Sequence, residues 1–190
     1  NFDGSYGSVS TLAHELGHAY HGYCIENHKP LNRSYSMPVA ETASTFNETH
    51  ISLHALEQSD DRDQKLAVLE ELLAGASQTI VDISSRFLFE QEVFTRVEKE
   101  FLDADALQAI MLKAQEETYG EAMAEDLRHP YMWVCKGHYY STGLSYYNFP
   151  YAFGTLFSMG LYAKYREEGS SFMVKYKEML EKTTVASCED

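Results

Sequence analysis

Residues 11–21 read Thr-Leu-Ala-His-Glu-Leu-Gly-His-Ala-Tyr-His, and the rest of the chain is interpreted around this stretch. It contains the pattern His-Glu-x-x-His, with His14 and His18 four residues apart. On a helix, side chains at this spacing share a face, so the two imidazoles would supply half of a tetrahedral zinc site. Glu15 is turned away from the pair but stays within reach of a water at such a site, which is where a general base belongs.

The plain alternative is a solvated helix that carries two unrelated histidines. The residues around the pattern are mostly apolar, so we expect this helix to be buried; they are Leu12, Ala13, Leu16, Ala19 and Tyr20. Buried polar side chains need partners, and a metal ion would provide one for both imidazoles. The pattern and its flanks therefore favour a metal site.

A zinc enzyme needs a third protein ligand, and Glu41 is the best candidate. Ser36 and Pro38 are typical of a helix start, which would place Glu41 in an early turn and Glu48 two turns later on the same side. Taken alone, Glu41 could equally be a surface carboxylate near a helix N-terminus, where the helix dipole favours it. The His-Glu-x-x-His pattern nearby makes the role of ligand the better interpretation.

His21 is the rival third ligand. It follows His14 by seven residues, which is roughly 10 Å along a helix axis. One ion cannot easily bind both imidazoles, so we interpret His21 as a residue that supports the ligands or lines the cleft.

Three blocks of sequence resemble the thimet-oligopeptidase family of zinc peptidases, and most of all its oligoendopeptidase F branch. They are residues 14–21, residues 38–44 (Pro-Val-Ala-Glu-Thr-Ala-Ser) and residues 137–154, which include Tyr-Tyr-Asn-Phe-Pro-Tyr-Ala-Phe-Gly. The resemblance implies an all-α helical bundle with the zinc site between two helices. It also implies a zinc-dependent metalloendopeptidase that hydrolyses oligopeptides. One zinc ion per chain would be bound by His14, His18 and Glu41, with Glu15 as the catalytic base.

The resemblance further implies roles for the tyrosine-rich third block. Side-chain donors aimed at the carbonyl oxygen of the substrate stabilise the charge that develops there. By the resemblance, His138 and Tyr151 are such catalytic donors, and Tyr146 and Tyr147 bind substrate. The alternative is that these aromatic residues pack the core, where tyrosine is common.

Composition limits the class of partner. The net charge of −14 opposes nucleic-acid binding, which needs basic patches. No apolar run is long enough to span a membrane. The three cysteines, Cys24, Cys135 and Cys188, are far apart and form no disulfide framework, which favours a cytoplasmic location.

We expect residues 1–190 to form a single catalytic domain that is the C-terminal part of a longer protein. Periodicity predicts helices over about 8–26, 38–58, 62–100 (one or two helices, with a kink at Gly75), 103–120, 140–168 and 171–182. The isolated chain is expected to bind zinc but to cleave peptides poorly, and its half-cleft could self-associate.

Two other functions remain open from the sequence. One is a metal-binding module without turnover, against which the intact Glu15 argues. The other is hydrolysis of a non-peptide substrate at the same site.

Overall fold

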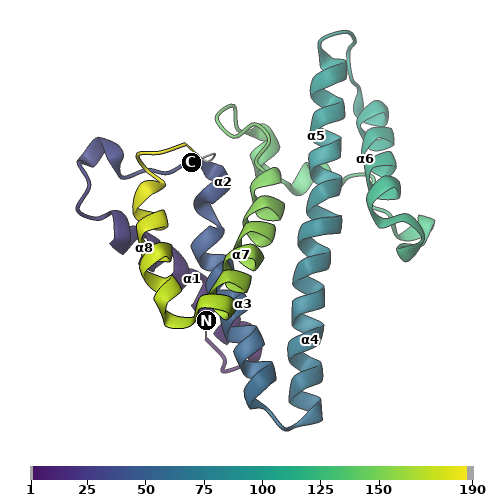
Figure 1. Ribbon diagram of the computed structural model, residues 1–190. Helices are drawn as coiled ribbons and strands as arrows, with labels where there is room; N and C mark the ends of the chain where they lie inside the picture. Colours follow the sequence, from purple (N-terminus) through teal and green to yellow (C-terminus); the bar gives the residue numbers. More distant parts are fainter. Residues whose placement is uncertain (1, 188–190) are drawn as a thin grey trace. The chain divides into compact units, whose positions relative to one another are not determined.

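The computed structural model describes residues 2–187, and every regular element in that part of the chain is helical (Figure 1). The all-α prediction is confirmed. None of the described helices is both long and apolar enough to cross a membrane. Cys24 is buried and Cys135 is exposed, and both are free thiols, whereas Cys188 lies outside the described residues.

The chain divides into two compact units. The first contains the residues up to Ala74 and those from Phe153 onward, and the second contains residues 75–152. The expectation of a single domain therefore stays a prediction.

The first unit is built from the two ends of the chain. Its helices are α1 (Tyr6–Ile25), α2 (Met37–Ala40), α3 (Thr42–Gln58), most of α4 (Arg62–Ser77), most of α7 (Phe149–Glu168) and α8 (Phe172–Lys182), with short 3₁₀ turns η1 (Pro30–Asn32) and η7 (Gly169–Ser171). Its core joins α1, α3, α7 and α8 through Cys24, Ala43, Phe46, Tyr162, Phe172, Tyr176 and Leu180. This core holds the helix of the His-Glu-x-x-His pattern against α3.

Helix α1 differs from its prediction at both its start and its surface. It begins at Tyr6, two residues before the predicted start, and Ser5 caps it, because the Ser5 side chain accepts a hydrogen bond from the amide of Ser8. The helix is only half buried: Leu12 and Leu16 are exposed. Apart from Ile25 at its end, the buried face carries small or polar residues, namely Ser10, Ala13, Gly17, His21 and Cys24.

Glycine and alanine on this buried face let α1 and α3 approach closely. A Cβ atom built on Gly17 would lie 2.4 Å from the carbonyl oxygen of Ala43 and 2.5 Å from the Cα of Ser44. Because these atoms are backbone, no side chain can move to make room. Only glycine therefore permits this spacing between the two helices.

The second unit contains η2 (Gln78–Asp82), α5 (Ile83–Val97) and α6 (Ala104–Tyr119), followed by the 3₁₀ turns η3 (Gly120–Ala122), η4 (Glu125–Leu127), η5 (Met132–Cys135) and η6 (Gly137–Tyr140). Helices α5 and α6 lie side by side (Figure 1). Their core consists of Phe89, Ile110, Met111 and Ala114, against which Trp133 and Tyr139 pack. Asp103 caps α6 by accepting a hydrogen bond from the amide of Ala106, close to the predicted start at residue 103.

Two predicted helices differ from the structure. The helical region from Arg62 to Val97 contains a π-helical segment at residues 78–82, and Gly75 lies within α4. The helix expected from about Tyr140 begins only at Phe149. Pro150 explains this start, because proline is favoured in a first turn, where its missing N–H is not needed. Tyr146, in the preceding loop, has a φ of 55° that no α-helix contains.

Candidate metal centre

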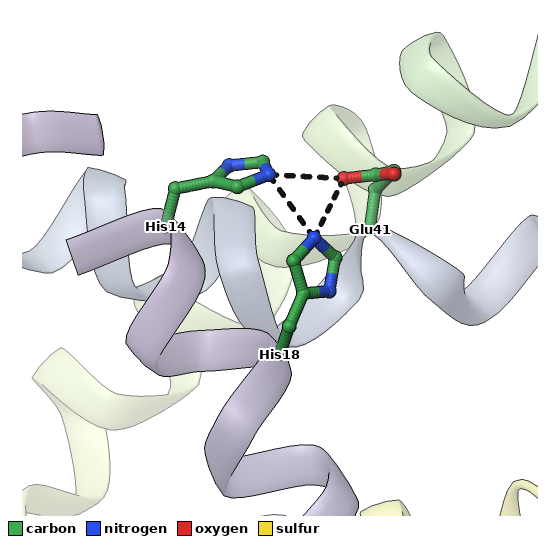
Figure 2. Close-up of side chains that lie close together, drawn as sticks. All are labelled: His14, His18 and Glu41. Atoms are coloured by element: carbon green, nitrogen blue, oxygen red, sulfur yellow. Dashed lines mark hydrogen bonds and ion pairs between the residues drawn. The ribbon is translucent and has the colours of Figure 1, made fainter. Parts of the chain in front are cut away.

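His14, His18 and Glu41 point toward one another in the first unit (Figure 2). The Nε2 atoms of the two histidines are 3.1 Å apart. The Oε2 atom of Glu41 lies 3.3 Å from Nε2 of His14 and 3.5 Å from Nε2 of His18. Among the described residues, these three form the group of His, Cys, Asp and Glu side chains whose donor atoms converge in this way.

This triangle fits a tetrahedral zinc ion. Zinc binds histidine nitrogen and carboxylate oxygen at about 2.0–2.2 Å, and a tetrahedron of that size has edges of roughly 3.3–3.6 Å. The observed edges run from 3.1 to 3.5 Å. Two imidazole nitrogens that face each other at 3.1 Å also need a proton or a cation between them, because their lone pairs repel. The residues present therefore suit the metal that the sequence indicates.

Glu41 owes its position to a break in the predicted second helix. It separates α2 from α3, with φ −89° and ψ 1°, in the sparsely populated bridge region of backbone conformation. The hydroxyl of Ser44 donates to the Glu41 carbonyl at 2.9 Å and to Oε2 at 3.2 Å. Gly154 in α7 lies against it, since a Cβ there would be 3.0 Å from the Cβ of Glu41. Ser44 thus holds the carboxylate of Glu41, and Gly154 packs against its Cβ.

The carboxylates also control the charge of His14. Hydrogen bonds to Glu41 and then to Glu48 raise the pKa of His14 to about 10. The bond from His14 in turn lowers the pKa of Glu41. In the metal-free chain a proton therefore occupies this site at neutral pH, and a metal ion has to displace it.

Glu15 and His21 occupy different surroundings from the three converging residues. Glu15 is exposed on α1 and follows His14 directly in the sequence. His21 is completely buried; its Nε2 lies 2.8 Å from the hydroxyl of Thr183, and its ring stacks on Tyr35 at 3.9 Å. Burial lowers the pKa of His21 to about 4. His21 therefore does not line an open cleft.

The tyrosine block lies in the second unit, and its predicted residues separate into two groups. The hydroxyl of Tyr151 donates to that of Tyr147 at 2.7 Å, and the Tyr147 ring lies 5.3 Å from that of His138. Nε2 of His138 is 3.0 Å from the amide nitrogen of Asn148, and burial lowers the pKa of His138. These three predicted residues form one cluster.

Tyr146 belongs to the second group. Its ring packs against Phe87 and Phe94, with centroids 5.7 and 5.3 Å away. Its backbone amide donates to the buried carboxylate of Glu90 at 2.6 Å. The packing interpretation of an aromatic residue thus fits Tyr146 better than it fits Tyr147.

Sequence reasoning missed three supporting residues of the metal centre. Glu48 approaches Nδ1 of His14 at 3.2 Å, Asn47 donates to the carbonyl of Ala13 at 3.2 Å, and Ser44 contacts Glu41. The seven-residue spacing of Glu41 and Glu48 was the available signal, since it puts both carboxylates on one side of a helix. Ser44 belongs to the second block of resemblance, but nothing in the sequence indicates a supporting role for Ser44 or Asn47.

The fold and this centre define a class: an all-helical protein in which a His-Glu-x-x-His helix and a neighbouring carboxylate converge on a metal-sized space. The chain belongs to peptidase family M3, whose pattern matches residues 1–182.

The chain is similar to oligopeptidase PepF of Bacillus subtilis, with 28% identity over 182 residues, 95% of this chain and 27% of that protein. It is 30% identical to the chromosomal oligoendopeptidase F of Lactococcus lactis subsp. cremoris over 156 residues, 81% of this chain and 25% of that protein. A crystal structure of a candidate peptidase from Chlamydophila abortus superimposes with a TM-score of 0.80 and 26% identity. It covers 97% of this chain, which corresponds to 31% of that structure. The chain thus spans less than a third of the length of these relatives.

Proposed function

We propose that this chain carries the catalytic centre of a zinc-dependent metalloendopeptidase that hydrolyses oligopeptides. The observation that carries the proposal is the triangle of His14, His18 and Glu41 donor atoms, whose edges match those of a tetrahedral zinc site. Membership of peptidase family M3 supports the reaction class. The names of the relatives, oligopeptidase and oligoendopeptidase, support the substrate class.

The roles proposed for the residues follow from their chemistry. His14, His18 and Glu41 would hold the zinc ion. When bound, zinc supplies a Lewis acid that lowers the pKa of water and polarises a carbonyl group. Glu15, the exposed neighbour of His14, takes the proton of the attacking water and returns it to the leaving amine.

We further propose that His138 and Tyr151 donate hydrogen bonds to the carbonyl oxygen of the scissile bond as it gains negative charge. Tyr147, whose hydroxyl accepts from Tyr151, is proposed as a substrate-binding residue. Tyr146 suits this role less well than Tyr147, because its ring packs against Phe87 and Phe94 and its backbone amide donates to Glu90.

A cytoplasmic location and self-association are parts of the same proposal. The free thiols of Cys24 and Cys135 favour a reducing compartment. Exposed apolar side chains on α1, such as Leu12 and Leu16, favour self-association.

Two measurements test the proposal. Zinc content and zinc affinity are determined on the 190-residue chain, where one ion per chain is expected. Cleavage of a mixed library of quenched-fluorescent peptides is measured on the natural protein that carries these residues, with Glu15→Gln as the matched variant. Glutamine keeps the shape but cannot accept the proton, so we expect retained zinc and a rate lowered by about 10²–10⁴-fold.

Each result discriminates between functions. A chain that takes up no zinc contradicts the metal centre. Zinc without peptide cleavage in the natural protein favours a metal-binding module without turnover. Zinc with cleavage of another bond type favours a non-peptide substrate. Near-normal activity of Glu15→Gln removes Glu15 from the role of base.

A further inference from the structure

A cavity of about 480 Å³ lies within the first unit, where it is lined by residues of α2, α7 and α8 and by the start of α3. Its apolar walls are formed by Val39 of α2, Phe153 and Phe157 of α7, and Met179 of α8. The rings of Phe153 and Phe157 stack with their centroids 5.6 Å apart. Cavities of this size hold small organic ligands, and aromatic rings beside a thioether suit an apolar and above all an aromatic side chain.

A buried hydroxyl at this cavity has no partner. Thr42, the residue after Glu41, lines the cavity and is only 1% exposed, yet its Oγ1 makes no hydrogen bond with any described residue. Buried polar atoms are nearly always paired, and leaving one unpaired lowers stability. A ligand that brings a polar atom to Oγ1 would remove this loss. The unpaired hydroxyl therefore indicates a ligand that has polar as well as apolar parts.

Two side chains of opposite charge also line the cavity. Glu178 and Lys182 both belong to α8 and lie one helical turn apart. A glutamate four residues before a lysine often pairs with it on a helix, but neither of these side chains forms an ion pair or hydrogen bond with another described residue. Lys175, which also lines the cavity, is paired with Glu168 at 2.7 Å. One carboxylate and one ammonium group are therefore available to a ligand.

We propose that this cavity binds a small zwitterion with an apolar side chain, namely a free aromatic amino acid or a dipeptide that contains one. Lys182 pairs with the carboxylate of the ligand, and Glu178 pairs with its ammonium group. The apolar side chain of the ligand lies against the four wall residues, and a polar atom of the ligand bonds to the hydroxyl of Thr42. This inference goes beyond the proposed function and requires no bound zinc, because none of the three proposed metal ligands lines the cavity.

Binding is measured by nuclear magnetic resonance on the metal-free 190-residue chain with ¹³C-labelled methionine methyl groups. Met179 lies in the cavity wall, whereas Met111 is fully buried in the core of the second unit. Phenylalanine at millimolar concentrations is expected to shift the Met179 signal to saturation, because the bound ring changes the magnetic field at this methyl group. The Met111 signal should not move. Leucyl-phenylalanine is titrated in parallel, and the tighter binder of the two identifies the free amino acid or the dipeptide as the ligand.

Ligands that lack one charge test which residue holds which group. Phenylalanine methyl ester has no carboxylate, and N-acetylphenylalanine has no ammonium group. Lys182→Met should weaken binding of phenylalanine by roughly 3–10-fold and leave binding of the ester unchanged. Glu178→Gln should weaken binding of phenylalanine to a similar extent and leave binding of N-acetylphenylalanine unchanged. Lys177→Met is the control, because Lys177 is an exposed residue of α8 that does not line the cavity, and it should leave all affinities unchanged.

The hydroxyl of Thr42 gives a readout that does not depend on charge. Valine has nearly the shape of threonine but no hydroxyl, so ligand-free Thr42→Val should unfold at a higher urea concentration than the wild type. The same variant should bind phenylalanine more weakly, because the polar atom of the ligand loses its partner.

The results separate a specific site from unspecific contact. A saturable shift of Met179, together with the matched losses in Lys182→Met and Glu178→Gln, supports the proposal. No shift of Met179 with either ligand overturns it. Equal affinity of phenylalanine for the wild type and for both charge variants also overturns it.

Discussion

The close approach of α1 to α3 makes Gly17→Ala a sharp test of how the metal centre is built. The new Cβ would meet the backbone of Ala43 and Ser44 at 2.4–2.6 Å, whereas ordinary contact begins at 3.4 Å. The two helices must therefore separate by roughly 0.8–1 Å, because interiors are close-packed and backbone cannot swing aside.

This separation has a calculable effect on the ligands. His14 and His18 both lie on α1, so their 3.1 Å spacing is retained. Glu41 moves with α3, and its distances of 3.3 and 3.5 Å to the two imidazoles grow toward about 4.2–4.5 Å, beyond the roughly 3.3–3.6 Å edge of a tetrahedral site. We expect zinc affinity to fall by more than the roughly 10–100-fold loss that follows when a residue hydrogen-bonded to a metal ligand is removed.

The stability of the metal-free chain gives an independent measure. Overpacking costs about 1–3 kcal/mol, while replacing glycine by alanine within a helix contributes about 1 kcal/mol in the opposite direction. Gly22→Ala is the matched control, because Gly22 is on α1 and a Cβ there meets nothing within 4 Å. The assay is urea unfolding and zinc competition on both variants. Gly17→Ala with the affinity of the wild type and the stability of Gly22→Ala would refute the reasoning.

Three further predictions follow from the two units. Glu41→Ala should lower zinc affinity by more than about 100-fold, whereas His21→Ala should change it little, and zinc titration showing the reverse order would make His21 the ligand. In the natural protein, Tyr151→Phe and His138→Ala should each lower kcat by about 10²–10³-fold with little change in KM, and an effect confined to KM would assign these residues to substrate binding. His21 is neutral and buried, with a pKa of about 4 instead of 6.5, so the unfolded chain binds more protons between these values. The contribution of His21 to the free energy of unfolding is complete above pH 6.5 and should fall by about 2 kcal/mol at pH 5. It is measured as the difference in the free energy of urea unfolding between the wild type and His21→Gln. A difference that does not change with pH would contradict the effect of burial.

Local sequence signals were sufficient for the helices that have clear ends. The predicted helix over 103–120 matches α6, which Asp103 caps and which ends at Gly120 with φ 52°. The prediction of helix boundaries failed where a contact between residues far apart in the sequence determines the backbone conformation. The local sequence predicts a continuous helix through Glu41. In the structure the helix breaks at Glu41, where Gly154 packs against it, and no neighbouring residue in the sequence predicts this break.

At the candidate site too, features set within one helix could be predicted, whereas features set by packing between helices could not. The spacing of His14 and His18 is a property of one helix, and it correctly predicted that their side chains lie together. Glu41 was proposed from the helix start at Ser36 and Pro38 and then supported by the resemblance, because spacing along one helix does not say how two helices pack. The prediction that α1 is buried holds for one face only, and that face carries mainly small or polar residues, which a search for apolar side chains overlooks.

The left-handed backbone of Tyr146 bears on the order in which the chain folds. A non-glycine residue in this conformation is strained by about 1–3 kcal/mol unless its surroundings compensate. Here the compensating bond comes from Glu90, 56 residues earlier on α5. The loop cannot settle until α5 is in place, so Tyr147 acquires its orientation late, through a contact of long sequence separation. In pulse-labelled hydrogen exchange during refolding, the amide of Tyr146 should gain protection only after the amides of α5, and earlier protection would reverse this order.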